Sequence, residues 1–254
     1  MNTESTLLIF DIHQDTNWIQ RILEKEDGNF THLLLGGDYF DAKSDRAGSI
    51  TDICALLLEL EDKYGDDMTL LWGNHDIHYL ETIPTMRRHQ NPRHQRYKIP
   101  GDYSNSKAKK LSKLLPRRLL DKGRLFTKIS GHLISHAGIA AKFWPSADSA
   151  EASIETLNRL SHEAMLKLPY EANPLLLPGK TRGGDQATGG LTWLDFDEEF
   201  EDALQLPQIF GHTPSFAETI ISRARRKGNS WCLDGAQTIY GILDASGELS
   251  IRET

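Results

Sequence analysis

The stretch TLLWGNHD, residues 69–76, joins a short apolar run to four polar or turn-forming residues that follow it directly. A run of this length bounded by turn formers is typical of a buried strand. The same pattern recurs at 6–10 before Asp11, at 32–35 before Asp38, at 132–135 before His136 and at 207–210 before His212. Each of these runs therefore predicts a buried strand that ends in a polar side chain.

The segments between and after these runs indicate how the strands are connected. Residues 16–27 and 49–64 carry apolar side chains at the 3.6-residue period of an amphipathic helix. Strands that alternate with helices predict right-handed βαβ units in a partly parallel sheet. Four further strand patterns follow, at 217–221, 230–233, 238–243 and 248–252. We expect this meander to close the fold as an antiparallel or mixed sheet.

Composition limits the class of protein. The chain has 254 residues, of which 39% are hydrophobic and 26% charged, and this favours a single soluble globular domain over 1–254. The 29 Lys and Arg against 36 Asp and Glu give a net charge of −7, which excludes a whole-protein cationic field for nucleic acid. Two cysteines exclude a disulfide framework and favour a reducing, cytoplasmic compartment. No signal peptide or membrane-spanning run is apparent, so we expect no membrane association.

The polar residues at the predicted strand ends are candidate metal ligands, because ligands of open α/β sheets bind outside the carboxyl ends of the strands. The candidates are Asp11, His13, Asp38, Asn74, His136 and His212. Their mixture of carboxylate, amide oxygen and imidazole suits Mn, Fe, Zn or Ni better than Ca or Mg alone. Taken singly, each acidic or amide residue is also typical of a cap or turn, and each histidine of a buried core position. Together, five such strand ends in one chain favour a metal site.

In chain order, these residues form motifs that resemble those of the calcineurin-like metallophosphoesterases. The motifs are Asp11-Ile-His13, Gly37-Asp38-Tyr-Phe-Asp41, Gly73-Asn74-His75-Asp76, His136 within SHAG, and Gly211-His212-Thr-Pro214. Pro214 stands where nucleases and phosphodiesterases of the family have a second histidine, so the resemblance is to the phosphoprotein-phosphatase-type branch. That branch includes Ser/Thr protein phosphatases and symmetrical diadenosine tetraphosphate hydrolases. The resemblance implies an α/β (α+β) fold in which a two-sheet mixed β-sandwich is flanked by helices in four layers.

The resemblance also implies a role for each motif residue. Two divalent metal ions are expected, Mn most of all, with Fe, Zn or Ni as alternatives. Asp11, His13 and Asp38 would hold the first ion, and Asp38 would bridge to the second, which Asn74, His136 and His212 would complete. A metal-bridging hydroxide would attack phosphorus. His75 would protonate the leaving group as general acid, and Asp41 would orient His75.

The chain departs from the family pattern at two positions. Gln14 replaces the glycine that usually follows the first histidine, which matters little if the backbone angle there is ordinary. Ala42 stands where protein phosphatases have an arginine that contacts the substrate phosphate, so that clamp is missing. Arg182, in the glycine-rich GKTRGG, and Arg46 are the candidates to hold the phosphate instead. The alternative for Arg182 is a solvated loop arginine.

Residues 84–118 hold eleven Lys or Arg and one acidic residue, and we interpret them as a basic insert or cap. One interpretation is that the segment binds a polyanionic substrate. The favoured interpretation is a solvated charge run, paired with the acidic residues 195–202. Residues 107–118 are typical of a plain amphipathic helix with Leu111, Leu114 and Leu115 inward. The acidic residues 195–202 themselves are typical of the N-terminal half of a helix. Asp234 and Gly235 resemble a closing turn of the family and are expected to be structural.

The sequence therefore predicts a dimetal phosphoesterase, a hydrolase that cleaves phosphate monoesters as Ser/Thr protein phosphatases do. The substrate would be a phosphoprotein, a nucleotide or a small phosphomonoester; nucleic acid is not favoured. The alternative within the same fold is symmetrical hydrolysis of dinucleoside polyphosphates. The alternative of another class is a non-catalytic module that binds a phospholigand or nucleic acid.

Overall fold

A computed structural model describes residues 4–82, 103–167, 172–219 and 223–254 of the chain. The strands are β1 (Ser5–Ile9), β2 (His32–Leu35), β3 (Met68–Leu70), β4 (Phe126–Ile129), β5 (His132–Ser135), β6 (Gln208–Phe210), β7 (Arg225–Lys227), β8 (Ser230–Cys232), β9 (Ile239–Asp244) and β10 (Leu249–Glu253). The helices are α1 (Thr16–Lys25), α2 (Ile50–Tyr64), α3 (Asn74–Thr82), α4 (Asn105–Leu114), α5 (Arg117–Lys122) and α6 (Ala150–Lys167). Short 3₁₀ helices are η1 (Gly65–Asp67), η2 (Ala141–Phe143), η3 (Pro174–Leu176) and η4 (Lys180–Arg182). None of these described helices is long and apolar enough to cross a membrane.

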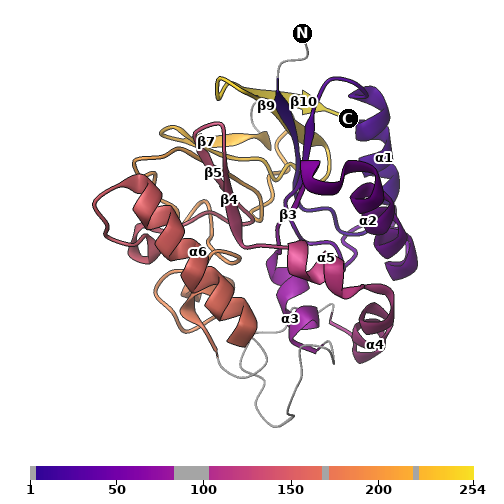
Figure 1. The fold of residues 1–254 in the computed structure, drawn as a ribbon, viewed down its shortest axis with the longest axis horizontal. Coiled ribbons are helices and arrows are strands. Elements are labelled where there is room, and N and C mark those ends of the chain that lie inside the picture. The colour runs from indigo at the N-terminus through magenta and orange to yellow at the C-terminus, as the bar shows by residue number, and fades with distance from the viewer. Residues whose placement is uncertain (1–3, 83–102, 168–171, 220–222) are drawn as a thin grey trace.

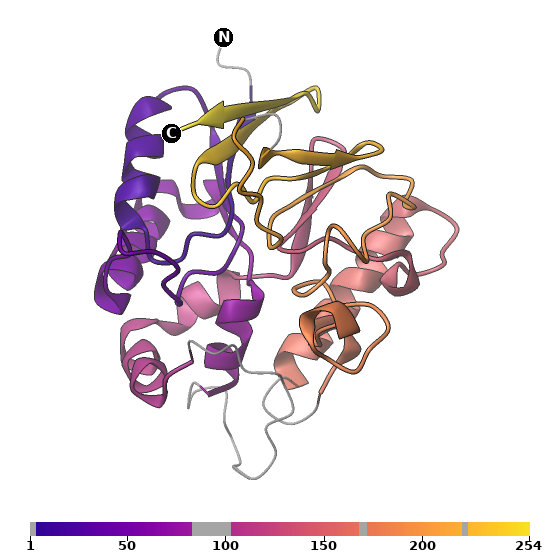
Figure 2. The same cartoon turned by 180° about the vertical axis from the view of Figure 1, so that it is seen from behind.

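The described strands form two five-stranded mixed sheets, in the orders β10-β9-β1-β2-β3 and β4-β5-β6-β8-β7. In the first sheet β1, β2 and β3 are parallel, joined through α1 and α2, and β9 runs antiparallel to β1. In the second sheet β5, β6 and β8 are parallel, with antiparallel strands at both edges. Figures 1 and 2 show the C-terminal strands (yellow) beside the indigo N-terminal strand. The predicted βαβ units and mixed sheets are therefore confirmed, but the expected C-terminal meander is divided between the two sheets, since β8 lies in the second sheet and β9 and β10 in the first.

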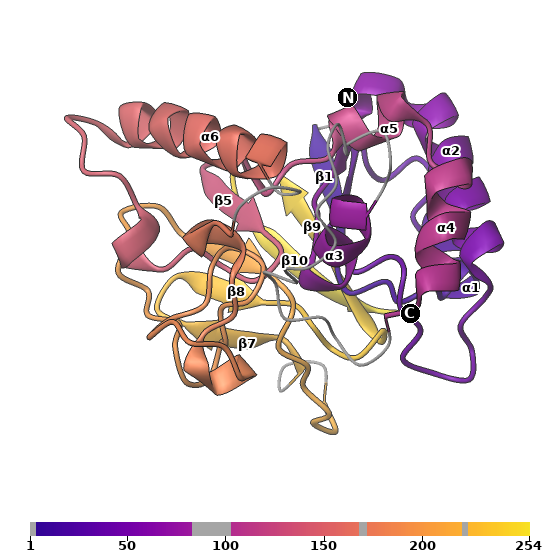
Figure 3. The same cartoon turned by 90° about the horizontal axis from the view of Figure 1, so that it is seen from below.

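The two sheets pack face to face, and helices cover the outer faces. Leu8 of β1 and Leu34 of β2 belong to one buried cluster with Ile134 of β5 and Ile209 of β6. The alternate residues of β1 point the other way, toward the helix side, as the period of two along a strand requires. Figure 3 shows α1, α2 and α4 on one side of the sheets and α6 on the other. This arrangement is the predicted two-sheet sandwich flanked by helices.

Local signals in the sequence explain where the first helices begin. Asp15 caps α1, because its Oδ1 accepts a hydrogen bond from the Trp18 backbone N–H at 2.9 Å. Ser49 and Asp52 cap α2 reciprocally, each side chain bonding to the backbone N–H of the other. Both caps follow directly on the loops that carry candidate site residues, so they fix where these loops end.

Three predictions about local structure were wrong. The expected helix over 107–118 is two helices, α4 and α5, because Pro116 cannot continue a helix. The acidic residues 195–202 form turns: Asp195 Oδ1 accepts the backbone N–H groups of Asp197 and Glu198 at 2.9 and 3.0 Å. Of the strand expected over 217–221, residues 217–219 are not in a strand, and the remaining two lie outside the described residues.

Two edge strands, β4 and β7, were missed. β7 is the basic Arg225–Lys227, which pairs with β8 across the turn at Gly228 and Asn229. A search for apolar runs cannot find such a strand, because its residues are charged. Charged residues suit an edge strand that is exposed to solvent. Much of the basic segment 84–118 lies outside the described residues, since only 103–118 are described.

Candidate metal and active site

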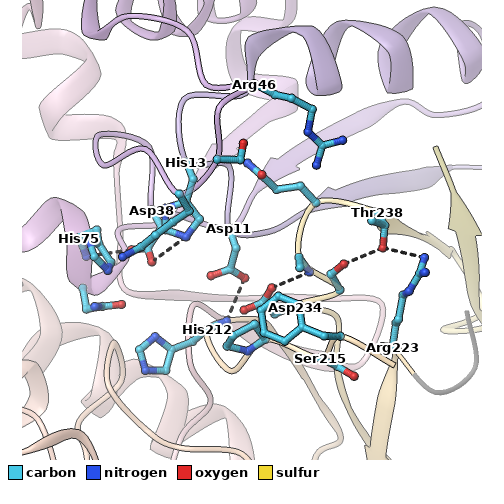
Figure 4. Close-up of a pocket in the computed structure, with 18 of the residues that line it drawn as sticks. Asp11, His13, Asp38, Arg46, His75, His212, Ser215, Arg223, Asp234 and Thr238 are labelled. Carbon is cyan, nitrogen blue, oxygen red and sulfur yellow. Dashed lines mark hydrogen bonds and ion pairs between the residues drawn. The ribbon is translucent and has the colours of Figure 1, made fainter. Parts of the chain in front are cut away.

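The six candidate metal ligands lie at one edge of the sandwich, each shortly after the end of a strand. Asp11 and His13 follow β1, Asp38 follows β2 and Asn74 begins α3 after β3. His136 follows β5, and His212 follows β6 of the same sheet. The site therefore draws on both sheets, and Figure 4 shows the labelled members facing a common cavity.

The ligand atoms form two groups that share one aspartate. Asp11, His13 and Asp38 bring ligand atoms within 4.8 Å of one another, and so do Asp38, His136 and His212. Asp38 Oδ2 lies 3.8 Å from His13 Nε2 and 3.5 Å from His136 Nε2. Its other oxygen, Oδ1, accepts the His75 backbone N–H at 2.9 Å. Asp38 can therefore face both groups through Oδ2 while Oδ1 is held by the backbone.

The hydrogen bonds of His136 show that its surroundings suit a cation. His136 Nδ1 donates to the Gly36 carbonyl at 2.8 Å, so the neutral ring carries a lone pair on Nε2. That nitrogen lies 3.1 Å from Asn74 Oδ1, which is itself an acceptor. Burial lowers the pKa of His136, which keeps the ring neutral. Several lone pairs that converge in a buried site are stabilised by a bound cation.

The surroundings of His13 and His212 likewise keep each ring neutral and leave one ring nitrogen available to a cation. His13 Nδ1 donates to the Asp41 carbonyl at 2.8 Å, which leaves Nε2 as a lone pair toward Asp38. Burial lowers the pKa of His13 to about 4, so the ring is neutral near pH 7. Burial, reinforced by His136, also lowers the pKa of His212 well below its ordinary value, and among the described residues His212 Nε2 has no hydrogen-bond partner. Neutral imidazoles, an amide oxygen and carboxylates are a donor set that fits borderline divalent metals.

Four of the six candidate ligands adopt a left-handed backbone conformation. The φ angles are 53° at Asp11, 47° at His13, 59° at Asp38 and 71° at His212. This conformation costs roughly 1–2 kcal/mol for a residue with a Cβ atom, and such strain gathers at functional sites. Asp76 helps to hold this conformation at Asp38, since its carboxylate accepts the backbone N–H groups of Asp38, Tyr39 and Gly73 at 2.8, 2.8 and 2.9 Å.

His75 and Asp41 form the expected pair beside the candidate ligands. His75 Nδ1 donates to Asp41 Oδ2 at 2.8 Å, and His75 lines the cavity. Burial alone would raise the pKa of Asp41, but interactions with His75, His78, Lys107 and Tyr79 lower it well below the usual range. Asp41 is therefore a carboxylate that fixes the ring and leaves Nε2 as the nitrogen available to the cavity.

The cavity that these residues line has a volume of about 870 Å³. Among the described residues, four cationic side chains border it: Lys43, Arg46, Arg182 and Arg223. Phe216, 81% exposed, and Trp193 provide aromatic surface. Lys43, Arg223 and Phe216 were not predicted from the sequence. For Lys43, the available signal was its position next to Ala42. Ala42 itself is exposed and is not among the described residues that line the cavity.

The two arginines predicted to hold phosphate both border the cavity, in different ways. Arg182 Nη2 lies 2.8 Å from Asp195 Oδ2 and donates to Thr213 Oγ1 at 3.0 Å, next to the candidate ligand His212, and its side chain is 26% exposed. Arg46 is 59% exposed and lies 3.9 Å from Asp15 Oδ2. Arg182 is thus oriented by its neighbours, and Arg46 projects into solvent. The acidic residues Asp195 and Asp197 pair with Arg182 and Arg225.

Asp234 forms the expected structural turn and also lines the cavity. Its Oδ1 accepts the Ala236 backbone N–H at 3.1 Å, and its carbonyl accepts the Ser215 N–H at 2.9 Å. Its side chain also lines the cavity, where burial, with a further contribution from Asp38, raises the pKa of Asp234 to about 6. Figure 4 shows it near Asp11 and His212.

The backbone angle of Gln14 is not ordinary, so the change from the family's glycine to glutamine is not a minor one. Its φ is 64°, the region that the family's glycine would adopt freely. The side chain donates through Nε2 to the Phe40 carbonyl, and the Gln14 carbonyl accepts the Gly48 N–H at 2.7 Å. The side-chain bond ties the β1 loop to the β2 loop, which compensates for the strain.

Replacing Gln14 with alanine should lower the free energy of unfolding by about 1 kcal/mol, because the bond to Phe40 is lost and the strain stays. Gln14→Gly should be more stable than Gln14→Ala, since glycine avoids the roughly 1–2 kcal/mol cost of the left-handed conformation. Urea denaturation of both variants measures this difference. A glycine variant less stable than the alanine variant would show that the backbone at this position is not strained.

Comparisons with known proteins bear on the family and the fold. A sequence model described as "calcineurin-like phosphoesterase" matches residues 7–216. A search of curated protein sequences finds no significant match. A crystal structure provisionally described as a diadenosine tetraphosphatase is similar with a TM-score of 0.50 and 14% identity, covering 99% of this chain and 94% of that one. A hypothetical protein from Pyrococcus horikoshii aligns with a TM-score of 0.46 and 10% identity, covering 100% and 88%.

Proposed function

Because the chain belongs to the calcineurin-like phosphoesterase family, a family of metal-dependent hydrolases that act on phosphoester bonds, we propose that it hydrolyses phosphate monoesters. The observation that carries this proposal is the His75–Asp41 pair beside two groups of metal-type ligands that share Asp38. A buried, paired histidine next to a cation site suits protonation of a leaving oxygen.

We assign the first metal position to Asp11, His13 and Asp38, and the second to Asp38, Asn74, His136 and His212. When bound, a pair of divalent cations acts as Lewis acid toward phosphoryl oxygens and activates water. The donor set supports Mn, Fe, Zn or Ni, and among these we propose Mn.

The protein's own groups supply the remaining chemistry. His75 gives the Nε2 proton to the leaving oxygen, and Asp41 holds the ring through Nδ1 and stabilises the positive charge that the ring carries when protonated. Arg182 and the more exposed side chain of Arg46 bind the phosphate in place of the arginine missing at Ala42. The support is that both border the cavity and that Asp195 and Thr213 orient Arg182.

The size of the cavity favours a second candidate, symmetrical hydrolysis of dinucleoside polyphosphates. About 870 Å³ is far more space than one phosphate group needs, and lies in the range of sites for larger organic ligands. Lys43 and Arg223 add cations beyond those near the candidate ligands, and exposed Phe216 offers an aromatic face for a base. A phosphopeptide could use the same surfaces.

A substrate panel tests the function. The Mn-loaded protein is assayed with para-nitrophenyl phosphate, a Ser/Thr phosphopeptide and diadenosine tetraphosphate. We expect phosphate release from the first two; formation of ADP from the third as the faster reaction would establish the second candidate. Lack of turnover with every substrate, despite two bound metals, would favour a non-catalytic module that binds a phospholigand or nucleic acid.

We also propose that residues 1–254 act as one domain in the cytoplasm. The single domain is supported by the site, whose residues follow strands of both sheets. The cytoplasmic location is supported by Cys54 and Cys232, which are both buried and unpaired, as suits a reducing compartment.

Replacing Arg182 with alanine should lower kcat/KM about 10- to 100-fold, since hydrogen bonds to charged groups contribute roughly 1.5–3 kcal/mol and each tenfold is about 1.4 kcal/mol. Arg182→Lys should recover only part of this loss, because an ammonium cannot make the paired contact of a guanidinium. Arg159→Ala is the matched control, since Arg159 pairs with Glu163 on exposed α6. Wild-type kinetics for Arg182→Ala would identify it as a surface residue.

A further inference from the structure

Helix α4 contributes a lysine to the buried carboxylate that orients His75. Lys107 Nζ lies 2.6 Å from Asp41 Oδ1, although the two residues are 66 positions apart in the chain. Asp41 is fully buried, and the Lys107 side chain is 21% exposed. This ion pair is therefore largely desolvated, unlike the surface pair Arg159–Glu163 on α6. Removing one partner of such a buried pair is strongly destabilising, because the other charge stays buried without compensation.

The donors to Asp41 are divided between its two oxygens. Oδ2 accepts from His75 Nδ1 at 2.8 Å and has the buried His78 Nε2 3.5 Å away, whereas Oδ1 accepts from Tyr79 Oη at 2.7 Å and from Lys107 Nζ at 2.6 Å. The carboxylate cannot turn without breaking bonds on both sides. Tyr79 and Lys107 therefore fix the direction in which Oδ2 meets the His75 ring.

The position of Lys107 is itself set by packing of α4. Ala108 and Leu111 bury the inner face of the helix, and α4 contacts α2 and α3. Ser104 caps the helix, accepting the Lys107 backbone N–H at 3.4 Å. The Tyr103 ring stacks on Tyr79, with centroids 5.1 Å apart. Helix α4 is thus docked against the helix that carries His75.

We propose that Lys107 is a positioning residue for proton donation: it holds Asp41 Oδ1 so that Oδ2 keeps the His75 ring aimed at the leaving oxygen. This inference rests on the proposed function of His75. It extends the His75–Asp41 pair to a Lys107–Asp41–His75 chain and makes α4 a part of the catalytic machinery. Lys107 does not touch the substrate in this account and acts only through Asp41.

The test uses Lys107→Met, which keeps an unbranched side chain only one atom shorter and removes its charge. Lys107→Arg restores the charge, and Lys109→Met is the control on the exposed face of the same helix. Each variant is assayed on an alkyl phosphate and on aryl phosphates with leaving groups of decreasing pKa, with metal content measured in parallel.

Lys107→Met should lower kcat on the alkyl phosphate about 10- to 100-fold, the usual cost of losing an outer partner of a site residue. The loss should shrink as the leaving group becomes more acidic, because less protonation is needed. Lys107→Arg should recover part of the rate, Lys109→Met should match the wild type, and the metal content should not change. In a His75→Asn background, Lys107→Met should cause no further loss.

An equal loss for all leaving groups, or a full additional loss in the His75→Asn background, would contradict the proposal and identify the pair as structural. A readout independent of activity separates this inference from the proposed function. The downfield proton resonance of His75 Nδ1–H, assigned by its absence in His75→Asn, should be lost or broadened in Lys107→Met and kept in Lys109→Met. An unchanged resonance would contradict the positioning role, whereas an inactive wild type would contradict the proposed function alone.

Discussion

Replacing His75 with asparagine should leave two metals bound and lower kcat by roughly 100- to 10,000-fold, the span of general acid–base catalysis. The asparagine amide can still donate to Asp41 Oδ2, where His75 Nδ1 donates at 2.8 Å, so the loop should keep its shape. It cannot transfer a proton to the leaving oxygen. Steady-state kinetics with an alkyl phosphate, together with metal analysis, measures the effect.

The dependence on the leaving group distinguishes proton donation from phosphate binding. The loss in His75→Asn should be smallest for aryl phosphates with acidic leaving groups. His162→Asn is the matched control, because His162 is exposed on α6. An equal loss across leaving groups of very different pKa would mean that His75 binds the phosphate instead of protonating the leaving oxygen.

Replacing Asp38 with asparagine should remove the charge that both metal positions share. The amide can retain the bond from the His75 backbone N–H, which Oδ1 accepts at 2.9 Å, so the fold should persist. Bound metals supply several kcal/mol of transition-state stabilisation, and we therefore expect activity to fall about 1,000-fold or more. Metal analysis should find that both ions are weakened or lost.

Asp45→Asn is the control for this change, because Asp45 is an exposed aspartate of the same loop. Circular dichroism shows whether Asp38→Asn remains folded. If folded Asp38→Asn kept two ions with wild-type affinity, Asp38 would not be the shared ligand, and the assignment of the two positions would have to change.

Much of the fold could be predicted because apolar runs and polar strand ends alternate in a regular order. The runs at 6–10, 32–35 and 132–135 overlap β1, β2 and β5, and the helices between them follow the 3.6-residue period. Pattern reasoning failed where side-chain bonds or edge position decide the structure, as in the Asp195 turn and the basic β7. It also did not identify α6, whose apolar face is short and interrupted by Ser153 and Ser161.

The candidate ligands could be proposed from the sequence because parallel strands place their carboxyl ends at one edge of the sheet. Lys107 could not, since nothing in its local pattern distinguishes it from Lys109 or Lys110 on the same helix. Only the docking of α4 brings it to Asp41. The left-handed backbone of Gln14 is likewise a property of the loop, and the residue type gives no indication of it.

We propose that the activity of this phosphoesterase requires two metal ions. The most direct test is a titration of the metal-free protein with Mn²⁺, in which bound metal and phosphate release from para-nitrophenyl phosphate are measured at each point. We predict saturation at two ions per chain, with activity that reaches its maximum only as the second ion binds. A folded protein that binds one ion or none, or that is fully active without metal, would contradict the account.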